Sequence, residues 1–568
     1  MALPSTKQDY LYYVVNILAI IFSVITGVML LYLWSVIYFH EYHLSVGYIH
    51  YLYNVLINQQ YTSLTYYVII LASMVSFTIF GIIISRNPYS KTLKFSRWAK
   101  WYDVKKMKPS VIQSNGYALG VFKNKLLRTN EPLGLLCVAP AGAGKTTGTV
   151  IPTVLSCDKD CLVINDPKGE LYEATYKYRN SIGKVFRIEW GQAEEEWSET
   201  TTFWNPLDLE NLAKTTVDRA KYIDAITNIL IKQTGGDAFW VNSGRKTLSA
   251  MMLFLIYKEE LAGLSTSISQ VKDKLATIGV TPDDEEEEKK GNADASQEGF
   301  KRLAKQCKHY EEEKLIPLEI ITRCYNVFSE LGATSPNTLG SILATISSDL
   351  SIFNNESVRK ITSKNSFSMN NIRGLNNKPV SIYLISPASE QELFGVLSGI
   401  FVETAYKFIT SQDLKIVKDS NIVRFILDEV AFFPKISAVI DGPAIARGYR
   451  GSFLFVCQDL GQIKEKYGEN GLNTMMTNTA FKIILPQNNN ETAHRLASLS
   501  GKTQKIEWVG KDKHRAKQKQ EINLIEATDV MSLPEGLQII IVQNNARTPI
   551  LCKIPFFFKD KGMLKKLK

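Results

Sequence analysis

The chain has 568 residues, of which 45% are apolar and 21% are charged, and its formal net charge is +10. This length provides for several domains, and this composition excludes an intrinsically disordered chain. The positive charge suits contact with nucleic acid or anionic lipid, although many basic proteins bind neither. The seven cysteines form no Cys-x-x-Cys pair, and most lie in apolar runs, so we expect reduced core residues.

Two apolar stretches near the N-terminus predict membrane spans at about 11–38 and 64–84. Each is long enough for the ~20 residues that a bilayer core requires. Lys and Arg are absent between residues 9 and 84 and frequent between 86 and 108, which places residues from 86 onward in the cytoplasm. We therefore expect a transmembrane hairpin over 1–90, with the 41–63 loop on the opposite side. Stop-transfer charge, lipid contact and DNA contact all remain possible explanations of the basic stretch.

Residues 139–146 read Ala-Pro-Ala-Gly-Ala-Gly-Lys-Thr and directly follow the apolar run 133–138. A strand, a loop of small residues and a helix start in this order are typical of a nucleotide phosphate-binding loop. Small residues allow backbone N–H groups to approach the phosphates, while Lys145 supplies a charge and Thr146 a hydroxyl ligand for Mg²⁺. The pattern predicts that ATP and Mg²⁺ bind here, and the alternative is a Gly-rich loop with an unrelated lysine. The predicted nucleotide-binding residues are Ala141, Gly142, Ala143, Gly144, Lys145, Thr146 and Thr147.

Eight apolar runs recur at the spacing of a parallel sheet with crossover helices. Several show no alternation of apolar and polar residues, which indicates strands buried on both faces and an α/β fold with helices on either side. The runs are 133–138, 161–165, 184–188, 380–385, 422–427, 452–456, 480–485 and 537–542.

Two carboxylates, Asp428 and Glu429, directly follow the run 422–427. Asp428 would hold Mg²⁺ through water, and Glu429 would polarise the attacking water. An Asp-Glu pair after a strand is a weak signal by itself. Together with the phosphate-binding loop it predicts an ATP hydrolase.

Helical periodicity dominates between residues 207 and 344, which predicts a separate all-α insertion. Within it, residues 283–288 are six consecutive acids that form either a solvated loop or a docking site for a basic partner. The basic segment 502–519 lies between two strand runs. We expect a loop there, either merely solvated or facing a nucleic-acid channel.

The order of these features resembles the type IV secretion coupling proteins, the TraG/TraD family of HerA/FtsK-type P-loop ATPases. Matching pieces include the two N-terminal spans, the segment Val-Ile-Asn-Asp-Pro-Lys-Gly-Glu at 163–170, Asn205-Pro206-Leu207, the Asp428-Glu429 pair and Gln458 in Val-Cys-Gln-Asp. The resemblance implies a RecA-like P-loop nucleotide-binding domain with a mainly parallel central sheet. That domain would comprise residues 91–206 and 345–568, with the all-α domain inserted at 207–344 and the transmembrane hairpin at 1–90.

The resemblance also implies residue roles. Gln458 would sense the γ-phosphate, and Arg447 would be an arginine finger that acts on the nucleotide of a neighbouring subunit. A surface salt bridge is the alternative for Arg447, and Arg450 is its nearest competitor for the finger role. The matching Asp166, Lys168 and Glu170 have no role that we can derive, and helix capping would explain the aspartate equally well. The predicted catalytic residues are Lys145, Glu429, Gln458 and Arg447, and the predicted metal ligands are Thr146 and Asp428.

For function, the resemblance implies a homo-hexameric ATPase in the bacterial inner membrane, multi-pass, with loop 41–63 periplasmic and the bulk of the chain cytoplasmic. It would recruit a relaxase bound to DNA, or effector proteins, and deliver them to the channel components of a type IV secretion system. Contact with single- or double-stranded DNA would be independent of sequence. The rivals are an FtsK-like DNA translocase, the assembly ATPase of the same machine, and a nucleotide-binding receptor without motor activity.

Overall fold

The computed structural model of the protein describes residues 73–76, 95–232, 238–279, 292–509 and 516–568. The chain divides into two units, Met1–Lys94 and Phe95–Lys568, and nearly all of the described residues belong to the second unit. Apart from a helical turn at 73–76, the predicted spans 11–38 and 64–84 and the loop 41–63 lie outside the described residues. The acidic run 283–288 lies outside them as well.

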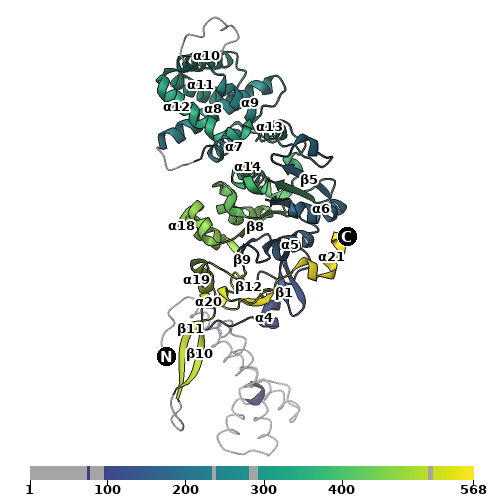
Figure 1. Ribbon diagram of the computed structural model, residues 1–568. Coiled ribbons are helices and arrows are strands. Elements are labelled where there is room, and N and C mark those ends of the chain that lie inside the picture. Colours follow the sequence, from purple (N-terminus) through teal and green to yellow (C-terminus); the bar gives the residue numbers. More distant parts are fainter. Residues whose placement is uncertain (1–72, 77–94, 233–237, 280–291, 510–515) are drawn as a thin grey trace, which may run out of the picture. The chain divides into compact units, whose positions relative to one another are not determined.

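An eleven-stranded sheet forms the centre of the second unit (Figure 1). Its strands are β1 (Tyr117–Phe122), β2 (Lys125–Thr129), β3 (Gly134–Val138), β4 (Cys161–Asp166), β5 (Lys184–Glu189), β6 (Val380–Ile385), β7 (Val423–Leu427), β8 (Gly451–Cys457), β9 (Thr479–Ile484), β12 (Leu537–Val542) and β13 (Ile550–Lys553). Their order is β2-β1-β13-β12-β9-β3-β8-β7-β4-β6-β5. The strands from β9 to β5 are parallel to one another, whereas β12, β13, β1 and β2 pair antiparallel.

All eight apolar runs form strands of this sheet, so the prediction of a largely parallel α/β sheet is confirmed in this part of the chain. One detail was wrong. The run 537–542, expected as a further parallel strand, forms β12, which pairs antiparallel with β9 and with β13. A continuous apolar run reports burial on both faces but contains no information on strand direction.

The sheet is covered on both faces, and side chains that alternate along β8 belong to two different hydrophobic clusters. Phe453 and Phe455 pack in the cluster that contains α14 (Gln391–Thr410), whereas Leu454 and Val456 pack in the cluster that contains α5 (Ile151–Ser156). All seven cysteines are buried and unpaired, which confirms their prediction as reduced core residues.

Further helices cover the sheet and its ends: α4 (Trp101–Lys106), α6 (Glu170–Ile182), α15 (Leu414–Val417), α16 (Ser437–Ile440), α17 (Gly442–Ile445), α18 (Leu460–Asn478), α19 (Asn490–Ser498), α20 (Ala527–Met531) and α21 (Lys561–Leu567). Within the described ranges one helix, α14, is long and apolar enough to cross a membrane, and 78% of its most apolar stretch is buried inside the fold. It packs as a core helix on the sheet.

Helices fill the described part of the chain between β5 and β6. The main ones are α7 (Thr216–Leu230), α8 (Ala238–Leu261), α9 (Ile268–Ala276), α10 (Asn292–Glu312), α11 (Leu318–Ala333), α12 (Pro336–Asp349) and α13 (Glu356–Ile361). Helix α8 is the centre of this region, because residues 247–257 are buried on every side. Helix α7 joins the region to the sheet domain, since Tyr222 and Thr404 of α14 share a hydrogen bond of 3.1 Å. The helices continue past residue 344, and the bounds of a separate all-α domain stay a prediction.

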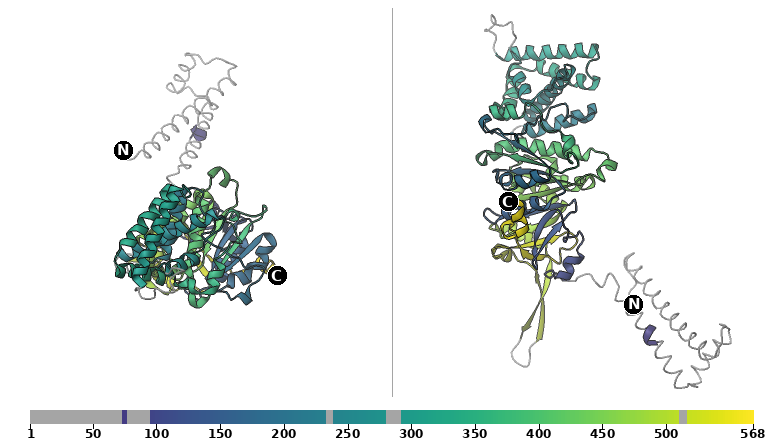
Figure 2. Two further views of the ribbon diagram at one scale, coloured as in Figure 1. Left: turned by 90° about the horizontal axis from the view of Figure 1, so that it is seen from above. Right: turned by 90° about the vertical axis from the view of Figure 1, so that its right-hand side faces the viewer.

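The basic segment 502–519 is not the loop that we expected. Its described residues, 502–509 and 516–519, belong to a two-stranded hairpin of β10 (Lys502–Val509) and β11 (Ala516–Asn523), paired from Lys502–Asn523 to Val509–Ala516. Its strands are rich in Lys, Gln and Glu, so the segment lacks the apolar run by which the other strands were found. The hairpin extends from the end of this unit that lies opposite to α8–α12 (Figures 1 and 2).

A buried ion pair fixes β7 to the turn before β4. The Nε of Arg424, which is fully buried, donates to Asp160 Oδ2 at 2.7 Å. Asn130 Oδ1 accepts from the same guanidinium at 2.8 Å, and the ring of Tyr117 lies beneath it. Burial alone would lower the pKa of Arg424, but the charge of Asp160 raises it above its ordinary value.

We predict that Asp160→Asn lowers the free energy of unfolding by about 3–5 kcal/mol, because it leaves a buried guanidinium without its counter-charge. Urea denaturation followed by tryptophan fluorescence measures this change. The matched control is Glu298→Gln, which breaks an exposed ion pair with Lys301 and should leave the midpoint unchanged. Equal midpoints for the two variants would contradict the prediction.

Candidate functional site

The loop after β3 has the backbone geometry that a phosphate-binding loop needs. Gly142 and Gly144 both have positive φ, at 78° and 83°. A Cβ on Gly144 would also lie 2.7 Å from the ring of Phe556, so glycine is required at this position for two reasons. The chain then enters a helical turn at 146–150 that continues into α5. Backbone N–H groups of a loop that leads into a helix in this way are suited to binding an anion.

Three predicted catalytic residues meet beside this loop. The Nζ of Lys145 lies 2.5 Å from Glu429 Oε2, and Gln458 Nε2 donates to the same oxygen at 3.2 Å. Lys145 follows β3, Glu429 follows β7 and Gln458 follows β8, which pairs with both of those strands. Residues that are 284 positions apart in the sequence are therefore in contact.

A cavity of about 440 Å³ opens at this edge of the sheet. Six of the seven predicted nucleotide-binding residues line it, namely Ala141, Gly142, Gly144, Lys145, Thr146 and Thr147. The side chain of the seventh, Ala143, packs against the hydrophobic cluster instead. Asp428, Glu429 and Gln458 also line the cavity. Sequence reasoning missed Gln391 and Phe432, which the fold brings here from α14 and from the turn after β7.

The carboxylate of Asp428 is suited to a cation. It is buried, and among the described residues its Oδ1 has no hydrogen-bond partner, while Asn165 Nδ2 donates to its main-chain carbonyl at 2.7 Å. Burial raises the pKa of Asp428 to about 7; the charge of Lys145 opposes this shift and that of Glu429 reinforces it. Oxygen ligands of this kind are those that Mg²⁺ prefers, so Asp428 and the hydroxyl of Thr146 fit the metal predicted here.

Glu429 has a left-handed backbone, with φ 58° and ψ 55°. This conformation costs a non-glycine residue roughly 1–3 kcal/mol and persists only where the surroundings hold it. The buried strand β7, which ends just before Glu429, holds the backbone, and the carboxylate contacts Lys145 and Gln458. With this backbone conformation the side chain reaches the lysine of the phosphate-binding loop.

The segment after β4 forms another wall of the cavity. Asp166 Oδ2 accepts the backbone N–H of Tyr172 at 2.8 Å, so the aspartate caps the start of α6, as the capping alternative predicted. Burial raises the pKa of Asp166 to about 6, although backbone N–H groups oppose the shift. Lys168 and Glu170 line the cavity too.

Arg447 does not lie in the cavity. It is exposed in the helical turn Ala446–Tyr449, directly before β8, whereas Gln458 directly follows β8. Arg447 therefore lies at the opposite edge of the sheet from the phosphate-binding loop of its own chain. In the described part of the chain its side chain makes no ion pair, so the salt-bridge alternative has no support there. Arg450 lies at the same edge with a left-handed backbone.

Known proteins resemble this chain over most of its length. Residues 91–568 match the profile of the family described as "Type IV secretory system Conjugative DNA transfer". A conjugal transfer protein TraG of Escherichia coli is 23% identical over 69% of this chain and 59% of its own length. Protein VirD4 of Rhizobium rhizogenes is 25% identical over 67% of this chain and 51% of its own. The chain thus spans about half to three-fifths of the length of these curated relatives.

Solved structures share the fold. The unbound bacterial conjugative coupling protein TrwBdeltaN70 superposes with a TM-score of 0.57 over 81% of this chain and 93% of that chain, at 14% identity. The plasmid coupling protein TrwB in complex with ADP and Mg²⁺ gives the same TM-score at 16% identity, over 82% of this chain and 94% of that chain. At these identities the likeness is one of fold alone.

We predict that Asp428→Asn stabilises the nucleotide-free protein above pH 7. Because the pKa of Asp428 is raised on folding, the folded state binds more protons than the unfolded state between about pH 4 and pH 7, and stability falls as pH rises through this interval. The variant lacks that penalty. Its unfolding temperature should exceed that of the wild type at pH 8, and the difference should shrink as pH is lowered toward 4.

Differential scanning fluorimetry across this pH range measures the difference. The control is Asp419→Asn, at an exposed position. Its unfolding temperature should not differ from that of the wild type in a way that depends on pH. If the unfolding temperatures of Asp428→Asn and the wild type differed by the same amount at every pH, the claim that burial raises the pKa of Asp428 would be refuted.

Proposed function

The chain belongs to the type IV secretory system conjugative DNA transfer family of coupling proteins, and we propose on that premise that it is an ATPase. In this proposal the protein uses ATP hydrolysis to deliver cargo to a type IV secretion channel. One observation carries the proposal: Lys145, Glu429 and Gln458 converge on a single cavity at the phosphate-binding loop. A binding loop alone would serve a receptor, but a carboxylate placed beside the loop lysine supports hydrolysis.

The side chains divide the chemistry among them. Lys145, once it leaves Glu429, is positioned to neutralise phosphate oxygens above the loop. Glu429, freed from the lysine, then accepts a proton from the attacking water, and the amide of Gln458 orients that water or the γ-phosphate. Mg²⁺, held by Thr146 and Asp428, would supply neutralisation of the charge on the phosphates. The plasmid coupling protein TrwB, which shares this fold, forms a complex with ADP and Mg²⁺, and this supports the proposal that the cavity binds a nucleotide and Mg²⁺.

We further propose that the protein acts as a homo-hexameric ring. Arg447 is exposed and lies at the sheet edge opposite to the cavity of its own chain. A guanidinium in that position is able to stabilise phosphate charge only in the site of an adjacent subunit. The placement of Arg447 therefore supports an active site shared between subunits.

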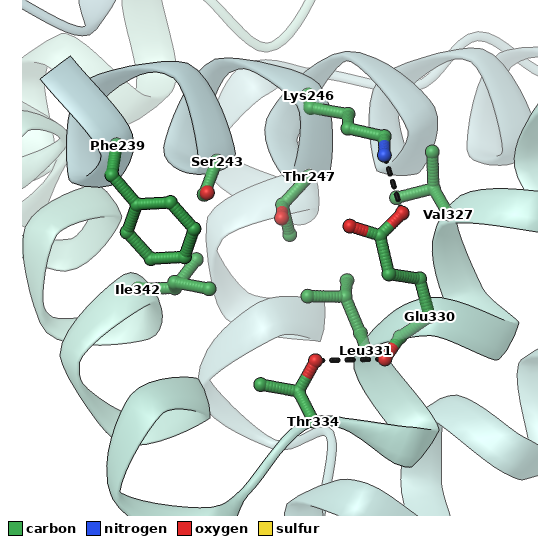
Figure 3. Close-up of a pocket in the computed structure, with 9 residues that line it drawn as sticks. All are labelled: Phe239, Ser243, Lys246, Thr247, Val327, Glu330, Leu331, Thr334 and Ile342. Atoms are coloured by element: carbon green, nitrogen blue, oxygen red, sulfur yellow. Dashed lines mark hydrogen bonds and ion pairs between the residues drawn. The ribbon is translucent and has the colours of Figure 1, made fainter.

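The proposed cargo is a relaxase bound to DNA, in keeping with the family's description, with effector proteins as the alternative. The spans 11–38 and 64–84 would hold the protein in the inner membrane beside the channel, and the helices within 207–344 would receive the cargo. Figure 3 shows a cavity of about 40 Å³ among α8, α11 and α12, where Lys246 pairs with Glu330 and Phe239 is half exposed. It is too small for a cargo segment, so docking would use the outer surfaces of these helices.

We predict that Lys145→Ala and Glu429→Gln each lower ATP turnover at least 100-fold, because the first removes phosphate neutralisation and the second removes the base. Phosphate release by the purified protein measures turnover, and DNA transfer between mating cells measures function. Glu429→Gln should keep nucleotide binding, which separates loss of chemistry from loss of the ligand. Unchanged transfer with both variants would favour the receptor without motor activity, and DNA movement without any secretion channel would favour the FtsK-like translocase.

We also predict that mixing Arg447→Ala with Lys145→Ala restores part of the activity that each variant lacks. In a mixed ring some sites combine an intact lysine from one subunit with an intact Arg447 from the next. ATP turnover as a function of mixing ratio tests this, with Arg450→Ala in place of Arg447→Ala as the control. A mixture no more active than its components would argue against a finger that acts between subunits.

A further inference from the structure

The segment from Asp166 to Glu170 faces the phosphate-binding loop across the cavity. It follows β4, and β4 is separated from the loop strand β3 by β8 and β7. Asp428 and Glu429 follow β7, so they lie between the loop and this segment. A phosphate chain that rests on the loop and points its end toward Asp428 therefore also points toward residues 166–170.

The backbone of this segment is fixed on both sides of Lys168. On one side, the Asp166 carboxylate accepts the N–H of Tyr172, and Gln391 Nε2 of α14 donates to the carbonyl of Pro167 at 3.0 Å. On the other side, Gly169 adopts a left-handed conformation, with φ 77°, that starts α6. The side chain of Lys168 itself stays exposed and lines the cavity. A held backbone with a free ammonium group is the arrangement expected of a ligand-binding lysine.

The charges of the cavity leave Lys168 available. Its walls contain two lysines, and Lys145 is paired with Glu429. Among the described residues, Lys168 is the lysine of the cavity that forms no ion pair, although Glu170 lies on the same wall. Even with Mg²⁺ bound, a nucleoside triphosphate has more negative charge than Lys145 alone is able to neutralise, so a second side-chain cation opposite the loop would stabilise it.

We propose that Lys168 binds the terminal phosphate of a nucleoside triphosphate and so distinguishes a triphosphate from a diphosphate. The proposal rests on the proposed function, because it assumes that the cavity holds a nucleotide. It follows from the order of the strands: the phosphates nearer the nucleoside lie on the loop, and the last one lies toward β7 and β4. Loss of that phosphate would release Lys168.

The experiment measures binding of two fluorescent nucleotides, mant-ADP and the non-hydrolysable mant-AMPPNP, to the full chain in the presence of Mg²⁺. Lys168→Ala should weaken binding of the triphosphate analogue about 10-fold to 100-fold and leave ADP binding within about twofold, because one charge-assisted contact is lost. Lys168→Arg should restore part of the loss. Lys177→Ala, an exposed lysine farther along α6 and outside the cavity, should bind both nucleotides like the wild type.

The outcomes separate this proposal from the one on which it rests. Suppose that the wild-type protein binds nucleotide, but that Lys168→Ala weakens binding of both nucleotides equally or of neither. That result overturns the role of Lys168 and leaves the ATPase proposal intact. If Lys177→Ala also weakened binding of the triphosphate analogue selectively, general surface charge would explain the effect, and the role of Lys168 would again be overturned. Wild-type protein that binds neither nucleotide overturns both proposals.

Discussion

The parallel pairing of β3, β8, β7 and β4 is the constraint on which the candidate site depends. Because parallel strands all end at one edge of a sheet, each strand delivers its following residue to the same cavity. The four strands contribute, in that order, the phosphate-binding loop, Gln458, the Asp428–Glu429 pair and the segment that contains Lys168. The unusual local features, an orphaned carboxylate oxygen and a left-handed glutamate, are tolerated because a sheet packed on both faces holds these strand ends in place.

Burial is the property of the fold that the sequence revealed best. The parallel strands are apolar on both faces and appear as continuous apolar runs, so their existence was predictable. The direction of β12 was not, because pairing with β9 is decided in three dimensions. The hairpin of β10 and β11 was missed because its polar strands lack such a run. Strands β1 and β2 were not predicted either, and β2 mixes Lys125, Arg128 and Thr129 with its leucines. In the turn between β1 and β2, Lys123 and Asn124 both have positive φ, and the asparagine is the one weak sequence indication of a hairpin there.

For the site, residue chemistry was more informative than pattern. The loop glycines, Lys145 and the acidic pair were predictable because nucleotide binding requires those residue types in that order. Gln458 and Arg447 were assigned by resemblance, and the structure brings the first to the cavity and leaves the second at the far edge of the sheet. Gln391 and Phe432 could not have been found, since only tertiary packing brings α14 and the turn after β7 to the loop.

Strand β8 has a mechanical consequence for the assembly that we propose. Arg447 lies in the turn before this strand and Gln458 directly follows it, so most of the backbone between the two side chains is a stiff, fully buried strand about 23 Å long. If hydrolysis of one nucleotide displaced Gln458, strand β8 would transmit the movement to Arg447, whose guanidinium would reach the nucleotide of the adjacent subunit. One end of β8 would then respond to the nucleotide of its own subunit, and the other end would change the contacts of the neighbouring subunit's nucleotide. This coupling would have a direction, because it would run from the nucleotide of one subunit to the nucleotide of the next.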